Sequence, residues 1–193
     1  MAVELANHIH EMTNAEKNSV AKLRFTDKAT QIALAKDRYL LCRKYLALNP
    51  NLCPKARDIL LAGKANSVKV NLMVAGHLND APDKIADVYY AARRRGIVWW
   101  SMSWFTRGSY WSGSGAVPNT PTKVLQDIYD TTLSTIANGR AGYGAERTLL
   151  ECVSHPNAPL EMALRASTSE MEKVKRAGFD RLVEIEKAKQ AAA

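Results

Sequence analysis

All seven prolines of this 193-residue chain lie in four short stretches, and each stretch also contains asparagine. The stretches read LNPNLCP (48–54), HLNDAP (77–82), VPNTP (117–121) and HPNAP (155–159). A proline in the first turn of a helix loses no hydrogen bond and has its φ already set, while asparagine tolerates turn dihedrals. The four stretches therefore predict four turns that each lead into a helix.

Apolar residues at helical spacing follow three of the closing prolines, and glycines separate one unit from the next. The apolar residues are Ile85, Ala86 and Val88, then Val124, Leu125 and Ile128, then Met162, Ala163 and Ala166; the glycine breaks are Gly63, Gly96 and 138–144. The closing prolines are 28, 39 and 38 residues apart, which is the range of stacked two-helix units. The pattern predicts an all-α, right-handed α-solenoid of about four helix pairs.

A family resemblance supports this fold. The segments NPNLCPKARDILL, AVPNTPTKVLQDI and SHPNAPLEMALRA resemble the Asn-Pro-x-Thr-Pro core of leucine-rich repeat variant proteins, which are right-handed superhelices related in style to HEAT arrays. The likeness covers roughly residues 37–166. The spacing here is longer than in that family, and the cysteine cluster of its iron–sulfur members has no counterpart. The resemblance implies the fold and no cofactor.

The chain ends have the pattern of caps on a single repeat domain. We expect an N-terminal cap over 1–36, repeats over 37–166 and a capping helix over 167–193. The segments TNAE (13–16) and SEME (169–172) both fit a capping box, and the second would open the last helix. Terminal helices with a polar outer face keep a repeat array from stacking end to end.

The net charge of +8 is concentrated in the N-terminal part of the chain. Residues 1–66 hold 11 Lys and Arg against 6 Asp and Glu, whereas residues 151–193 hold 7 against 7. No acid lies between Asp37 and Asp58, and five basic residues do: Arg38, Arg43, Lys44, Lys55 and Arg57. If the two helices here pack side by side, these side chains form a strip that suits a nucleic-acid backbone or an acidic protein. An ordinary solvated face is the alternative interpretation.

All four tryptophans lie in RRRGIVWWSMSWFTRGSYWSGSG (93–115). Ile97, Trp100 and Trp104 share one helical face, so they are expected in the core. The repeat does not require residues 106–116, and this insertion has three interpretations: an idle loop, a protein contact or a nucleic-acid contact. In the last case phosphates and bases would meet Arg93, Arg94, Arg95, Arg107, Tyr110 and Trp111.

Recognised catalytic and metal-binding motifs are missing from the sequence. It has no GxSxG, no P-loop and no CxxC pair, and we expect Cys42, Cys53 and Cys152 to be buried free thiols. His77 and His155 precede two of the turns and are expected to stabilise them rather than to bind metal. We therefore expect a protein that is not an enzyme and has no cofactor, metal or small-molecule substrate.

The function that these patterns favour is binding of nucleic acid, DNA or RNA, or of a nucleoprotein through the basic face. The alternative is an adaptor that docks an acidic protein through the same face and the tryptophan segment 97–116. No apolar run approaches the roughly 18 residues of a membrane span. The first residues hold acids and histidines where a signal peptide has a basic start, so we expect a cytoplasmic protein without membrane contact.

Overall fold

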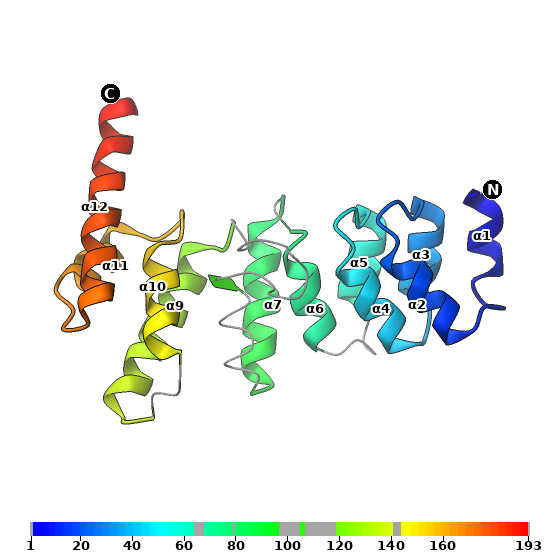
Figure 1. Cartoon of the computed structure of the whole chain (residues 1–193), viewed down its shortest axis with the longest axis horizontal. Coiled ribbons are helices and arrows are strands. Elements are labelled where there is room, and N and C mark those ends of the chain that lie inside the picture. Colours follow the sequence, from blue (N-terminus) through cyan, green and yellow to red (C-terminus); the bar gives the residue numbers. More distant parts are fainter. Residues whose placement is uncertain are drawn as a thin grey trace. The chain divides into compact units, whose positions relative to one another are not determined.

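A computed structural model describes residues 2–63, 68–78, 80–96, 105–106, 119–140 and 144–192, with side chains from residue 5 onward. Within these ranges the chain forms α-helices and no strands (Figure 1). The described residues belong to two compact units: unit 1 holds residues 2–63, 68–78 and 80, and unit 2 holds residues 81–96, 105–106, 119–140 and 144–192. The prediction of an all-α protein is confirmed for the described part of the chain.

Unit 1 consists of six short helices that pack on one another in sequence. They are α1 (Ala2–His8), α2 (Asn14–Lys22), α3 (Lys28–Lys36), α4 (Leu40–Ala47), α5 (Pro54–Ala62) and α6 (Val68–Ala75). Each helix packs on the one two positions further along: α1 on α3, α3 on α5, α2 on α4 and α4 on α6 (Figure 1). This alternating packing is consistent with helical repeats, in which each unit contacts its neighbours.

The core of unit 1 lies between these two rows of helices. Leu34, Leu46 and Leu60 are fully buried there, one each from α3, α4 and α5. Val70 and Val74 of α6 belong to the same cluster. Because each helix supplies one apolar stripe, the core continues from one helix pair to the next and is not confined to one centre.

In its described residues, unit 2 holds three helices that are longer than those of unit 1, namely α7 (Pro82–Arg94), α9 (Thr122–Ala137) and α12 (Glu172–Ala192), and two short ones, α10 (Ala145–Val153) and α11 (Leu160–Ser167). The helix α9 packs on α7 and α10, while α12 packs on α10 and most extensively on α11. The α11–α12 contact is close because Gly178 has no side chain, and a Cβ there would lie 2.4 Å from the main-chain nitrogen of Ser167.

The prolines open helices as the sequence predicts. Pro54 and Pro82 are the first residues of α5 and α7, and Pro121 and Pro159 are the N-cap residues of α9 and α11. Both positions suit proline, because a helix has no intrahelical acceptor for its first N–H groups. The prediction that all four turns lead into helices is confirmed.

The first Asn–Pro turn is closed by Asn49. The side-chain oxygen of Asn49 accepts the N–H of Asn51 at 3.0 Å, and its main-chain oxygen accepts the N–H of Leu52 at 3.1 Å. Its side-chain amide donates to the carbonyl of Leu23 at 2.8 Å. A single buried side chain therefore shapes its own turn and ties it to the preceding one.

The fourth turn repeats this pattern with a histidine in the place of Asn49. Nδ1 of His155 accepts the N–H of Asn157 at 3.0 Å, and the carbonyl of His155 accepts the N–H of Ala158 at 2.8 Å. The amide of Asn157 reaches back to the carbonyl of Thr120, in the third turn, at 3.1 Å. The shared geometry gives the Asn–Pro motif a physical basis, namely a turn bound to its predecessor.

Glycines end the helices where left-handed backbone is needed. Gly96 follows α7 with φ of 72°, and Gly139 follows α9 with φ of 65°. Such angles cost a side-chain-bearing residue energy that glycine does not pay. Both positions confirm the glycine breaks predicted from the sequence.

One of the two predicted capping boxes forms. Thr13 caps α2, and its reciprocal hydrogen bonds with Glu16 complete the box. The prediction at 169–172 is wrong, because α12 begins only at Glu172. The hydroxyl of Ser169 instead accepts the N–H of Met171 at 3.2 Å, which closes a local turn ahead of the helix.

The three cysteines are free and buried, as predicted. Cys42 lies in the core of unit 1, where burial and the nearby charge of Asp37 raise the pKa of its thiol to about 11. Burial also raises the pKa of Cys152 in unit 2. Neither thiol is accessible to solvent, as a reactive cysteine has to be.

Candidate binding surface

Unit 1 has two edges, defined by the connections between its helices. We call residues 23–27, 48–53, 76–78 and 80, with the helix turns next to them, the turn edge, and residues 9–13 and 37–39, with the helix turns next to them, the opposite edge. At the opposite edge, Nζ of Lys17 pairs with Oδ2 of Asp37 at 2.7 Å. At the turn edge, Asn49 bonds to the carbonyl of Leu23. One contact joins α2 to the connection ahead of α4, and the other joins the turn after α2 to the turn after α4. The C-terminal ends of α2 and α4 therefore lie at the same edge.

Each acidic side chain described in unit 1 is engaged within the unit. Asp27 caps α3 through Thr30, Glu16 belongs to the capping box of α2, and Glu11 pairs with His8. Asp37 binds Lys17, while Asp58 and Asp80 both bind Arg57. Burial acts to raise the pKa of Asp37, but hydrogen bonds from Lys17 and the main chain at Tyr39 outweigh it and hold the pKa low.

Many basic side chains of unit 1 have no such partner. Among the described residues, the following are exposed or half-buried and form no ion pair with an acid: Lys22, Arg24, Lys28, Lys36, Arg38, Lys44 and Lys55. Lys22 lies over the ring of Tyr45, 4.0 Å from its centroid, which leaves its positive charge in place. Because the acids are engaged elsewhere, unit 1 presents a surplus of positive charge to its surroundings.

The positive charge gathers most densely at the turn edge. Lys22 ends α2, Arg24 lies in the first turn, Lys28 begins α3, and Lys55 lies in the first turn of α5. The N-terminal ends of α3 and α5 are adjacent, because Gln31 bonds to the carbonyl of Asn51 and to the N–H of Cys53. These four basic residues thus lie along one edge of unit 1.

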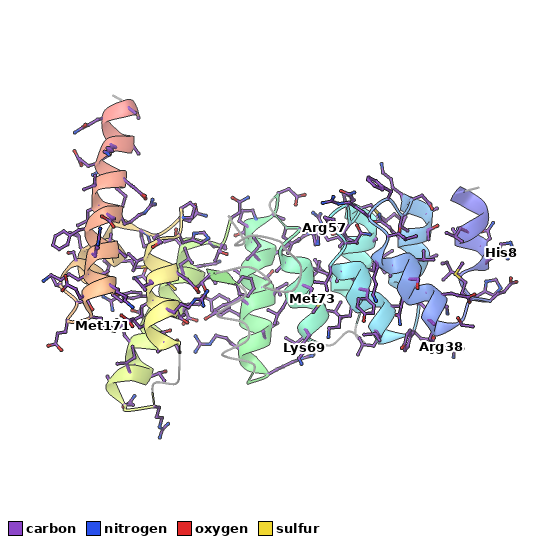
Figure 2. The ribbon with its side chains drawn as sticks, in the orientation of Figure 1. His8, Arg38, Arg57, Lys69, Met73 and Met171 are labelled. Carbon is purple, nitrogen blue, oxygen red and sulfur yellow. The ribbon has the colours of Figure 1, made fainter. Side chains whose placement is uncertain are left out.

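The five residues of the predicted basic strip do not lie on one exposed face. Arg38 lies at the opposite edge and Arg57 at the turn edge, and Figure 2 shows them on opposite sides of unit 1. Arg43 and Arg57 are buried, Lys44 is half-buried, and only Arg38 and Lys55 are exposed. A run without acids shows where charge accumulates along the chain, and helix geometry distributes it over different faces.

Arg57 holds the second turn in place. Its Nη1 donates to the carbonyl of His77 at 3.2 Å and to Oδ1 of Asp80 at 2.7 Å, and its Nε donates to Asp58 at 3.3 Å. The side chain is 10% exposed. Gln31 spans the same 20-residue separation one turn earlier, when it bonds to Asn51. Arg57 therefore has a structural role equivalent to that of Gln31.

The arginines predicted ahead of the tryptophan segment fall into two kinds. Nη1 of Arg93 donates to Asp127, to the hydroxyl of Tyr89 at 3.3 Å and to the hydroxyl of Thr131 at 3.0 Å, which links α7 to α9. Arg94 and Arg95, at the end of α7, are exposed. Arg93 thus contributes to the packing of unit 2, while its two neighbours are accessible.

The predictions for the tryptophan segment lie outside the described residues. They concern the core positions Ile97, Trp100 and Trp104, and the contact residues Arg107, Tyr110 and Trp111. These remain predictions from the sequence.

The most exposed large apolar side chain among the described residues is not one that the sequence predicts to be part of a site. Phe25, in the first turn, is 89% exposed. It lies beside an open groove of about 350 Å³ that is lined by Leu5, Val20, Leu23 and residues 24–27. A lone phenylalanine between α2 and α3 gives no signal of its orientation, so only the structure shows that it faces solvent.

The histidines stabilise turns, as predicted. Nε2 of His77 lies 3.0 Å from the carbonyl of Ala47, an acceptor only, so this nitrogen carries the proton. Burial lowers the pKa of His77, which favours the neutral ring. His155 serves the fourth turn through Nδ1. Within the described ranges no three His, Cys, Asp or Glu side chains gather as a metal site.

Comparisons with models of protein families, with curated proteins and with solved structures found no match. None of the helices in the described part of the chain combines the length and the apolar character that crossing a membrane requires.

Proposed function

We propose that this chain is a non-enzymatic protein that binds nucleic acid, alone or in a nucleoprotein, through the turn edge of unit 1. The observation that supports the proposal is the imbalance of charge in unit 1. The described acids are engaged in caps and ion pairs, while Lys22, Arg24, Lys28 and Lys55 are exposed along one edge. Phosphates bind such a surface and release their counterions, which gives affinity without any catalytic group.

We further propose that the helical repeats are of the α-solenoid type, similar to leucine-rich repeat variant and HEAT proteins. The alternating packing of α1 to α6 and the turns that bond to their predecessors support this proposal. In such arrays, equivalent turns recur along one edge. A row of equivalent turns places basic side chains at regular intervals, which suits a repeating phosphate backbone.

The geometry of the turn edge favours contacts with the backbone over contacts with base edges. The exposed cations come from a turn and from helix ends, and no helix of unit 1 presents them as a single projecting row. Contacts to phosphate position a protein but carry no sequence information. We therefore expect binding with little sequence preference and a steep dependence on salt.

Fluorescence anisotropy with labelled duplex and single-stranded DNA and RNA, titrated from about 50 to 300 mM salt, tests this proposal. Tight binding with a log–log slope of several units is expected. Arg24→Ala, Lys28→Ala and Lys55→Ala should each lower the slope by about one unit. Lys36→Ala is the matched control, because Lys36 is an exposed lysine at the other end of α3. No binding at low salt, or equal effects of all four variants, would contradict the proposal.

The alternative is an adaptor for an acidic protein that docks on the same surface and on the tryptophan segment 97–116. Positive charge that is not balanced within unit 1 attracts an acidic protein surface as well as phosphate. The two functions differ in their mutational response, because one or two side chains dominate a protein interface. If no nucleic acid binds, affinity purification of protein partners is carried out with the wild type and with Trp111→Ala. The adaptor function predicts that the variant loses a partner that the wild type retains.

A further inference from the structure

We propose that the first turn of unit 1 binds single-stranded nucleic acid by stacking a base on Phe25, while Lys22, Arg24 and Lys28 hold the neighbouring phosphates. This inference rests on the proposed function and assigns it a class of partner, a strand whose bases are free to stack. The aromatic ring, the groove beside it and the surrounding cations each support the assignment.

Phe25 is exposed on a turn that is held firmly in place. The hydroxyl of Thr26 donates to the carbonyls of Val20 and Leu23, both at 2.8 Å. The amide of Asn49 donates to Leu23, and the amide of Asn51 donates to the carbonyl of Arg24 at 2.8 Å. Gln31 binds the carbonyl of Thr26 at 2.8 Å.

The exposure of Phe25 therefore belongs to a defined backbone conformation. A large aromatic ring normally gains stability by burial, and Phe25 forgoes that gain at 89% exposure. An aromatic side chain carried on a fixed backbone is preorganised for a flat partner, because little backbone entropy is lost when the partner binds.

The groove beside Phe25 supplies an apolar wall for such a partner. Leu23, which is 58% exposed, and Val20 line it together with Leu5 of α1. The groove is open, so a base that stacks on Phe25 can rest its edge against these side chains while its sugar and phosphate remain in water. Non-specific single-strand binding combines aromatic platforms with a positively charged track in this way.

The charges around the ring are suited to a phosphate chain. Lys22, Arg24 and Lys28 lie within three residues of Phe25 and are exposed. Among the described residues that line the groove, Asp27 is the acid. Its carboxylate is turned to α3, where it accepts the N–H and the hydroxyl of Thr30 at 3.0 and 2.6 Å. Three cations against one engaged carboxylate leave the local field positive.

A single strand fits these observations better than a duplex or a peptide. In a duplex the bases already stack on one another, and a short turn is not an element that fills the major groove. A partner peptide would bind through an anchor side chain, and such an anchor needs a closed, desolvated pocket. The groove beside the exposed Phe25 is open, so it does not supply that pocket. An exposed ring among cations is the arrangement that stacking on single-stranded bases requires.

The test compares oligonucleotides of about 12 residues, in DNA and RNA form, with an abasic strand of the same length and with the corresponding duplex. Full-length protein is titrated by fluorescence anisotropy. Phe25→Ala removes the ring, Phe25→Leu keeps an apolar side chain without an aromatic face, and Phe25→Trp keeps the face. Leu40→Ala is the matched control, because Leu40 is exposed to 40% and begins α4 at the opposite edge.

The expected result is that wild type binds the normal strand at least about fivefold more tightly than the abasic strand. Phe25→Ala and Phe25→Leu should lose this difference, while Phe25→Trp and Leu40→Ala should keep it. A preference for RNA or for DNA identifies the natural source of the strand and is compatible with stacking.

Three results would overturn the inference. If the abasic strand or the duplex binds as tightly as the normal strand and Phe25→Ala changes nothing, stacking is refuted while the proposed function stands. If no nucleic acid binds at low salt, both fail. If a polyglutamate chain competes as well as the oligonucleotide and Phe25→Leu binds like wild type, the surface recognises acidic protein instead.

Discussion

The side-chain amide of Asn49 donates to the main-chain carbonyl of Leu23 at 2.8 Å, across 26 residues of sequence. One turn further along, His77 bonds to the carbonyl of Ala47 in the same way. Both acceptors lie at the C-terminal end of a helix, where carbonyls lack intrahelical partners. Asn49 and His77 therefore add hydrogen bonds at the C-terminal ends of α2 and α4, in each case the helix two positions before the helix that their own turn follows.

This relationship predicts a stability effect at Asn49. Asn49→Ala should lower the free energy of unfolding by about 2 kcal/mol, because a buried side chain that bonds to both the carbonyl of Leu23 and the N–H of Asn51 is lost. Urea denaturation, monitored by circular dichroism, measures the free energy of unfolding. Asn51→Ala is the control, since Asn51 is exposed and donates from its side chain to one carbonyl only, so its cost should stay below about 1 kcal/mol. Equal costs would show that burial of Asn49 is irrelevant.

His77 predicts a dependence of stability on pH. Burial lowers the pKa of His77 from its usual value of 6.5, so the unfolded chain binds this proton more readily than the folded one. The contribution of neutral His77 to the free energy of unfolding is therefore complete above about pH 6.5. It is lost as the pH falls toward the pKa of His77 in the folded protein. His77→Asn keeps a donor, as at Asn49, and cannot titrate.

Thermal unfolding at about pH 7.5 and about pH 5.5 tests the role of His77. The wild type should lose more stability between the two values than His77→Asn does. His8→Asn serves as the control, because His8 is exposed and pairs with Glu11 outside the core. A fall of the same size in wild type and His77→Asn would assign the pH dependence to other groups.

The helices could be predicted because the residues responsible act locally. Pro54 and Pro82 fix φ at a helix start, and Gly96 adopts the left-handed backbone that ends α7. These effects depend on a residue and its immediate neighbours. They led from the sequence alone to the sites of the turns and the breaks.

The binding surface was harder to predict because it depends on contacts between distant residues. Arg57 and Lys55 look alike in the sequence, yet Arg57 is buried against a turn 20 residues further along. The exposure of Phe25 has no signal in the sequence, because nothing local shows that Asn49 and Asn51 bond to its turn. A charge count cannot separate a structural arginine from an accessible lysine, since both satisfy the same local pattern.

The crossing of α11 and α12 predicts that Gly178 tolerates no side chain. A Cβ at Gly178 would lie 2.4 Å from the nitrogen of Ser167 and 2.8 Å from the carbonyl carbon of Ala166, both main-chain atoms. Gly178→Ala should therefore destabilise unit 2 by about 1–3 kcal/mol, despite the better helix propensity of alanine. Gly76→Ala, where the nearest atom is 3.7 Å away, is the control. A stabilised Gly178→Ala protein would contradict the close crossing.

The buried thiols predict slow chemical modification in the folded protein. The pKa of Cys42 is raised to about 11 by burial and by Asp37, and that of Cys152 is raised by burial. At about pH 8 neither forms an appreciable amount of thiolate, so a disulfide reagent should react only on unfolding. Variants that keep only Cys42 or only Cys152, with exposed Ser154→Cys as the fast control, report on units 1 and 2. Rapid labelling of either would contradict its burial.

Lys55 and Arg57 allow the structural and the binding roles of neighbouring cations to be separated. Arg57→Ala should lower the free energy of unfolding by about 1–3 kcal/mol, because it removes a buried donor from the carbonyl of His77 and leaves Asp80 without its 2.7 Å ion pair. Lys55→Ala should leave the free energy of unfolding within about 0.5 kcal/mol of wild type, because Lys55 is exposed.

In nucleic-acid titrations Lys55→Ala should have the larger effect, since only Lys55 is free to meet a phosphate, and its loss should reduce the salt slope by about one unit. Arg57→Lys keeps the charge but loses the fork of donors that reaches His77 and Asp80 together, so it should bind like wild type and unfold more easily. If Arg57→Ala reduced the salt slope while stability stayed unchanged, Arg57 would belong to the binding surface after all.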